Sequence, residues 1–140
     1  MKKKVCMLCI MLCFAMAGSY GIVYAGEAED SGIEPYAQNY QSVTANISSS
    51  SAGTIKATGI IVGKVGYTTK LSAQLSLQRY SGRGWITVGT WTETTNDSVL
   101  AMSKTKAVPK GYKYRTKAVF TAYAGTKSEK ITKYSGTLSY

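Results

Sequence analysis

The segment PKGYKYRTKAVFTA, residues 109–122, decides the fold class of this chain. After the turn signal Pro109-Lys110-Gly111, two kinds of side chain alternate along it. The residues expected to face inward are Tyr112, Tyr114, Thr116, Ala118, Phe120 and Ala122, and those expected to face outward are Lys113, Arg115, Lys117, Val119 and Thr121. Because a period of two places successive side chains on opposite faces, the segment is predicted to be a half-buried β-strand.

The segment 71–78 has the same period, with Leu or Ala alternating with Ser or Gln. The rest of the chain after Tyr36 is rich in Thr, Ser, Val, Ile and Tyr, with frequent Gly and no sustained helical stripe. Turn signals separate seven candidate strands: 41–49, 55–63, 70–80, 85–94, 98–107, 112–124 and 128–139. The sequence therefore predicts an all-β fold.

Seven antiparallel strands in this order fit an immunoglobulin-like or fibronectin type III-like β-sandwich, in which the third and sixth strands are neighbours in one sheet. The stretch Gly111–Tyr114 is similar to the corner before the sixth strand of such sandwiches, although the inter-sheet cysteines are absent. A small β-barrel is the alternative architecture.

The N-terminus is typical of a targeting segment. Three lysines, Lys2–Lys4, precede an apolar run from Val5 to Ala17, which is shorter than the roughly 20 residues that cross a bilayer. The small-x-small pattern Val23-Tyr24-Ala25 follows. We therefore expect residues 1–25 to be a secretory signal peptide, with cleavage after Ala17 as the alternative, and the protein to be secreted and extracellular.

Export would leave a chain without cysteine, because Cys6, Cys9 and Cys13 all lie in the apolar run. The stability of the remaining chain must then come from its core, and its length is enough for one independent domain. We expect residues 26–35 to be a flexible acidic tail and residues 36–140 to be a single sandwich domain.

The charge of the chain is strongly uneven. The whole sequence has 17 Lys or Arg, 7 Asp or Glu and no His, a net charge of +10. Residues 35–140 contain 14 of the basic residues and three of the acids, a net charge of +11. Without His, the common catalytic triads and imidazole metal sites are excluded, so neither a metal nor a cofactor is expected.

Carboxylates are the remaining candidates for catalysis. Glu93 and Asp97 flank one predicted turn, and a carboxylate pair is what glycoside hydrolysis requires. The alternative is that both are turn and solvation residues, and we expect that reading and no enzymatic activity.

Trp85 and Trp91 lie six residues apart, so an unbroken strand would place both rings on one face together with Thr87 and Gly89. Such a pair would form a flat aromatic platform for sugar rings. The alternative is that one or both rings belong to the core.

The outward row Lys113, Arg115 and Lys117 is the sharper candidate for a binding site. If the third and sixth strands are adjacent, this row borders Gln74, Ser76 and Gln78, and Lys130 and Lys133 from the last strand enlarge it. Such a face would attract anionic polymers, whereas the alternative is a solvated surface that resists edge pairing. The candidate ligand-binding residues are Gln74, Gln78, Trp85, Trp91, Lys113, Arg115 and Lys117.

A family resemblance adds to this reading. The succession Leu77-Gln78, Gly84-Trp85, Val88, Trp91, Gly111, Tyr114-Arg115, Ala118, Glu129 and Ser135 resembles a family of small secreted proteins of unknown function from Gram-positive, largely clostridial, bacteria. The resemblance covers about residues 36–139. It implies export and a compact β-rich domain, and it supplies no catalytic residues.

Together these features predict a secreted, non-enzymatic binding module whose partner is an anionic cell-surface polymer or glycan. No recognised nucleic-acid motif is present, so no specific nucleic acid is expected as a partner. One alternative is a secreted antimicrobial or toxin-like protein that acts on membranes. Another is a hydrolase of low activity that uses Glu93 or Asp97.

Overall fold

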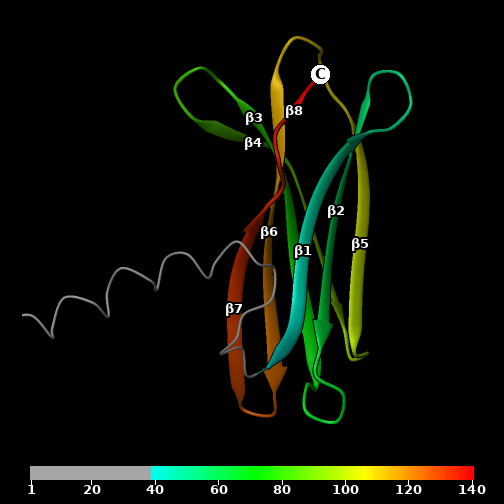
Figure 1. Ribbon diagram of the computed structural model, residues 1–140, viewed down its shortest axis with the longest axis vertical. Coiled ribbons are helices and arrows are strands. Elements are labelled where there is room, and N and C mark those ends of the chain that lie inside the picture. Colours follow the sequence, from blue (N-terminus) through cyan, green and yellow to red (C-terminus); the bar gives the residue numbers. More distant parts are fainter. Residues whose placement is uncertain (1–38) are drawn as a thin grey trace, which may run out of the picture. The chain divides into compact units, whose positions relative to one another are not determined.

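A computed structural model describes residues 39–140, which form eight β-strands (Figure 1). The strands are β1 (Tyr40–Ser49), β2 (Thr54–Gly63), β3 (Lys70–Tyr80), β4 (Trp85–Thr95), β5 (Val99–Ala107), β6 (Lys113–Ala124), β7 (Lys127–Tyr134) and β8 (Leu138–Ser139). The first six predicted strands are confirmed, with bounds that agree to within one residue. The predicted signal peptide, 1–25, and acidic tail, 26–35, lie outside the described residues.

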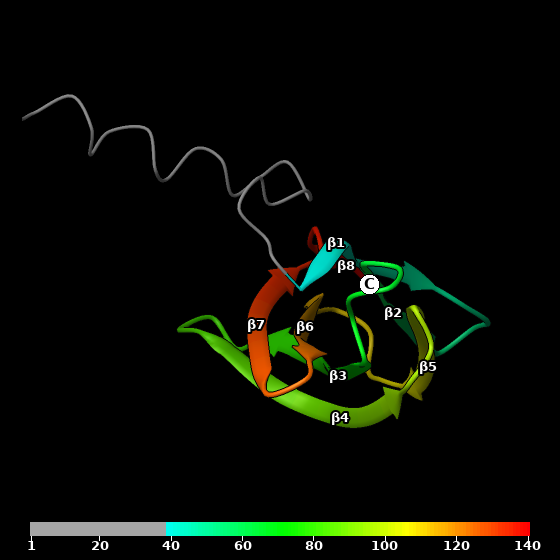
Figure 2. The same ribbon diagram turned by 90° about the horizontal axis from the view of Figure 1, so that it is seen from below.

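The strands form two antiparallel sheets that pack face to face, as Figure 2 shows in a view along the strands. One sheet has the order β1-β2-β5; the other has the order β4-β3-β6-β7, with β8 also paired to β6. The predicted adjacency of the third and sixth strands is confirmed by the antiparallel pairing of β3 with β6. The β-sandwich is therefore confirmed. The barrel alternative is wrong, because within residues 39–140 the two sheets remain separate ladders.

The last predicted strand, 128–139, is two strands rather than one. The backbone NH of Thr116 donates to Ser135 Oγ at 2.7 Å, and Ser135 NH donates to the Thr116 carbonyl at 2.9 Å. A side-chain oxygen thus replaces a backbone carbonyl in the ladder and ends β7 at Tyr134. Both β7 and β8 pair with β6, so the interruption is a local break along one edge of the sheet.

The core lies between the two sheets and follows the predicted alternation. Leu71, Leu75 and Leu77 of β3 are fully buried, and Ile55 and Ile61 of β2 meet them from the other sheet. Gly59 of β2 faces Leu75 of β3 closely, because a Cβ atom there would lie 2.5 Å from Leu75 Cδ2. Only glycine lets the sheets pack so closely at this point.

The inward row of β6 is confirmed with one exception. Five of its six members are fully buried: Tyr114, Thr116, Ala118, Phe120 and Ala122. Tyr112 was expected inward and is 43% exposed. The reason is that Tyr112 precedes β6 and follows Gly111, whose φ of 90° turns the chain before the strand alternation begins.

Tyr114 fixes the connection between β5 and β6. Its ring is fully buried, and its hydroxyl donates a 2.6 Å hydrogen bond to the carbonyl of Pro109, five residues upstream. Burial raises the pKa of the Tyr114 phenol, and the nearby Arg79 offsets part of this rise, so the hydroxyl stays a neutral donor. This is the geometry of the tyrosine corner of immunoglobulin-like sandwiches.

Replacing Tyr114 with Phe should lower the free energy of unfolding by about 1–2 kcal/mol, because the Pro109 carbonyl loses its donor. Tyr112→Phe is the matched control and should change it by less than about 0.5 kcal/mol. Chemical denaturation monitored by tryptophan fluorescence measures both. Equal effects of the two variants would contradict the corner as a source of stability.

At the buried hydroxyl of Thr116, unlike at Tyr114, we expect a substitution to raise the free energy of unfolding. Thr116 is fully buried, and its Oγ1 has no hydrogen-bond partner within residues 39–140. A buried hydroxyl without a partner costs free energy, and Val has nearly the same shape. We therefore expect Thr116→Val to raise the free energy of unfolding by about 1 kcal/mol, measured in the same assay. A destabilised variant would show that the hydroxyl is satisfied.

Candidate functional site

The candidate site is the solvent-facing surface of the sheet β4-β3-β6-β7, which we call the outer face. The register places Lys117 of β6 beside Ser76 of β3, and Arg115 beside Gln78. Lys113 is exposed, while Arg115 and Lys117 are half-buried. The predicted cationic row next to the polar residues of the third strand is therefore present on this face.

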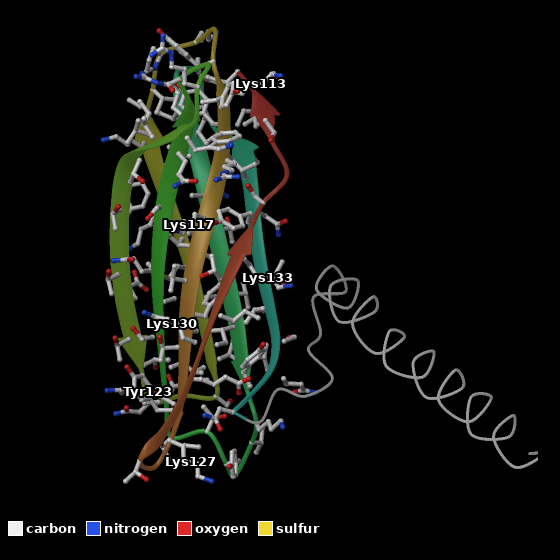
Figure 3. The ribbon with its side chains drawn as sticks, turned by 90° about the vertical axis from the view of Figure 1, so that its left-hand side faces the viewer. Lys113, Lys117, Tyr123, Lys127, Lys130 and Lys133 are labelled. Carbon is white, nitrogen blue, oxygen red and sulfur yellow. The ribbon has the colours of Figure 1, made fainter. Side chains whose placement is uncertain are left out.

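The outer face carries basic residues from three strands. By strand alternation and register they are Lys70 of β3, Lys113, Arg115 and Lys117 of β6, and Lys130 of β7. Figure 3 labels several of them along β6 and β7. Uncharged hydroxyl and amide side chains fill most of the positions between them: Ser72, Gln74, Ser76, Thr87, Thr90, Thr92, Thr94, Thr121, Ser128 and Thr132.

The three acidic residues of 39–140 all lie away from this face and have partners of their own. Glu93 pairs with Lys104 of β5, across the gap between the two sheets. Asp97 accepts a hydrogen bond from the Thr95 hydroxyl at 3.2 Å. Glu129 accepts one from the backbone NH of Asn39 at 2.9 Å. The outer face is thus cationic without an intrinsic counter-charge within the described residues.

One predicted member of the cationic face is misplaced. Lys133 was expected to enlarge the face together with Lys130, but it pairs with Ala118, whose side chain points into the core. Lys130 pairs with the outward Thr121 instead. Because residues three apart on a strand point to opposite faces, only Lys130 joins the outer face, and Figure 3 shows the two lysines on opposite sides of β7.

The predicted platform of Trp85 and Trp91 is wrong, because a β-bulge in β4 separates them. Thr87 pairs with Gln78 and Gly89 pairs with Leu77, which leaves Val88 as an extra residue and reverses the alternation. Before the bulge, Trp85 lies opposite the exposed Tyr80. After it, Trp91 lies opposite the buried Leu75 and packs against the core. Only Trp85 is on the outer face.

Arg115 is the centre of a stack that crosses the sheet. Its guanidinium carbon lies 4.3 Å from the ring centroid of Trp85 and 4.3 Å from that of Tyr134. Tyr80 continues the stack, with its ring 5.3 Å from Trp85. Tyr80 and Tyr134 were missed in the sequence, although each continues an outward row with a period of two from Gln78 and from Lys130.

Gln78 completes this arrangement, although the sequence predicts it on a solvated face. It is only 8% exposed, because its amide is engaged by its neighbours. Arg115 Nε donates to Gln78 Oε1 at 2.9 Å, and Gln78 Nε2 donates to Thr87 Oγ1 at 3.5 Å. Gln74, the other predicted amide, is exposed and pairs with Val119. The two amides therefore have different environments on the same strand.

Glu93 and Asp97, the two carboxylates considered for catalysis and expected to be turn and solvation residues, have separate partners in the structure. Glu93 is engaged by Lys104 and Asp97 by the turn residue Thr95, so each carboxylate has its own partner. Within residues 39–140, no group of three His, Cys, Asp or Glu side chains is placed to hold a metal ion. In the same part of the chain, no helix is long and apolar enough to cross a membrane.

Comparison with known proteins identifies no family for this chain. No family model matches the chain, and no curated protein matches it. Among solved structures, the solution structure of CsgH from R. palustris is similar with a TM-score of 0.37 and 10% sequence identity, covering 64% of this chain and 89% of that chain.

The opposite positions of the two tryptophans give a stability prediction. Trp91→Ala should lower the free energy of unfolding by about 3 kcal/mol, because the ring packs against the core between the two sheets. Trp85→Ala removes a contact with Arg115 on the surface and should cost less than about 1 kcal/mol. Thermal and chemical denaturation followed by circular dichroism measure both values. Similar losses of unfolding free energy in the two variants would contradict the bulge in β4, which places the two rings on opposite faces of the sheet.

Proposed function

We propose that the protein is a secreted, non-enzymatic binding module whose outer face binds an anionic cell-surface polymer or glycan. The observation that carries this proposal is the combination of five basic side chains and no acid on one sheet face within residues 39–140. A face of one sign raises the local concentration of an oppositely charged polymer and steers its approach. Export itself is supported by the sequence of residues 1–25, in which three lysines precede an apolar run and a small-x-small pattern.

The geometry of the outer face suits an extended ligand. Along one strand, alternate side chains are about 7 Å apart, and neighbouring strands are about 4.8 Å apart. Lys113, Arg115 and Lys117 therefore form a row that a chain with one negative charge per repeat can follow. Each exposed charge contact is weak in water, but contacts linked along one polymer reinforce one another.

Binding of this kind should depend on salt and on the position of the charges. We expect the triple variant Lys113→Ser/Lys117→Ser/Lys130→Ser to lose most of its retention on isolated Gram-positive cell walls at low salt, because it removes three cations from the outer face. The wild-type protein should elute as salt rises. Co-sedimentation with purified walls over a salt series measures both effects.

The matched control is Lys56→Ser/Lys106→Ser/Lys110→Ser, which removes the same charge from exposed positions outside the outer face. It should keep most of the retention. Equal losses in the two triple variants, or retention that does not change with salt, would contradict the proposal. Leakage of a dye from anionic liposomes, with retention on walls unaffected in both triple variants, would instead favour the alternative of a membrane-active protein.

A further inference from the structure

Arg115 differs from the lysines of the outer face because its guanidinium is held in one orientation. The rings of Trp85 and Tyr134 lie at 4.3 Å from its guanidinium carbon, and Gln78 Oε1 accepts a 2.9 Å hydrogen bond from its Nε. The four residues come from four different strands, β3, β4, β6 and β7. A side chain held at three points loses little conformational entropy when a ligand binds.

The two η nitrogens of Arg115 remain available to a ligand. A guanidinium has five N–H donors, and the bond to Gln78 uses the one on Nε. Within residues 39–140 the buried polar atoms without a partner are Arg79 Nε and Thr116 Oγ1, so the η nitrogens of the half-buried Arg115, which no described carboxylate contacts, are not sealed from solvent. They form a planar fork that matches two oxygens of a carboxylate or phosphate.

The surroundings of this fork indicate what carries the anionic group. Tyr80 is 39% exposed and Tyr134 is 49% exposed, so both offer aromatic surface beside Arg115. Aromatic surface next to an oriented cation suits the carbon skeleton of a sugar or polyol whose acidic group binds the cation. A polymer held only by diffuse charge would need neither the rings nor the fixed orientation.

We propose that Arg115 is a discrete oxyanion subsite, which binds one carboxylate or phosphodiester group of a sugar or polyol polymer through its two η nitrogens. This inference rests on the proposed function and names the group that the outer face recognises. The lysines of the face supply attraction along the polymer, whereas Arg115 sets the position of one repeat.

The first test replaces Arg115 with a side chain of the same charge. Arg115→Lys keeps the charge but removes the planar fork, and we expect about tenfold weaker binding of an oligogalacturonate or an oligo(glycerol phosphate). Arg83→Lys makes the same exchange at an exposed position in the turn between β3 and β4, outside the outer face, and as the matched control it should bind as tightly as the wild type. Calorimetric titration of the full chain measures both, and the two oligomers distinguish a carboxylate from a phosphodiester as the preferred group.

The second test keeps Arg115 and gives its guanidinium a carboxylate partner from the protein itself, which competes with the ligand. Gln78→Glu places a carboxylate against Arg115, while Gln74→Glu makes the same charge change at an exposed position four residues earlier on the same face of β3, opposite Val119. We expect Gln78→Glu to weaken binding several-fold more than Gln74→Glu. The Arg115 Nε–Hε signal in ¹⁵N NMR should shift when oligogalacturonate is added and stay unchanged with its neutral methyl ester.

The outcomes separate this inference from the proposed function. If Arg115→Lys and Gln78→Glu bind like their controls while the triple lysine variant loses retention on walls, the subsite is wrong and the proposed function stands. If all of these variants bind like the wild type, both are wrong. Should Arg115→Lys fail to fold, as judged by circular dichroism, the comparison of Gln78→Glu with Gln74→Glu decides.

Discussion

The antiparallel pairing of β3 with β6 is the constraint on which the rest of the structure depends. Its register places Leu75 opposite Ala118 and Ala73 opposite Phe120, which builds the core, and on the other side of the sheet it places Gln78 opposite Arg115. A slip of one residue would exchange the two faces and bury the cations. The same hydrogen-bonded ladder therefore fixes both the stability of the sandwich and the composition of the outer face.

Much of this was predictable because the alternation in β3 and β6 is strict. The buried and outward rows, the adjacency of the two strands and the position of Tyr114 at the start of the sixth strand all follow from a period of two and from turn signals. The bulge at Val88 was not predictable in this way. Both faces of β4 carry a mixture of apolar and polar residues, so one extra residue does not visibly break an alternation in the sequence. It moved Trp91 into the core.

The charge of the candidate site was predicted from the sequence, but the contacts that orient Arg115 were not. Alternation places Lys113, Arg115 and Lys117 on one face, but it does not show which of them has neighbours that orient it. The stack around Arg115 depends on the reversal of faces at the bulge, since only that reversal leaves Trp85 outward without Trp91. In physical terms, a cationic surface attracts many anions, and one oriented guanidinium among aromatic rings selects the geometry of one group.

The proposed binding of an anionic polymer to the outer face of β4-β3-β6-β7 can be tested directly on the protein in solution. The most direct measurement is a map of backbone amide shifts in ¹⁵N NMR while oligogalacturonate is titrated at low salt, repeated at high salt. We expect shifts concentrated on β3, β6 and β7 around Arg115 and Lys117, which fade as salt rises. Shifts concentrated on β1, β2 and β5, or an unchanged spectrum with both oligogalacturonate and oligo(glycerol phosphate), would contradict it.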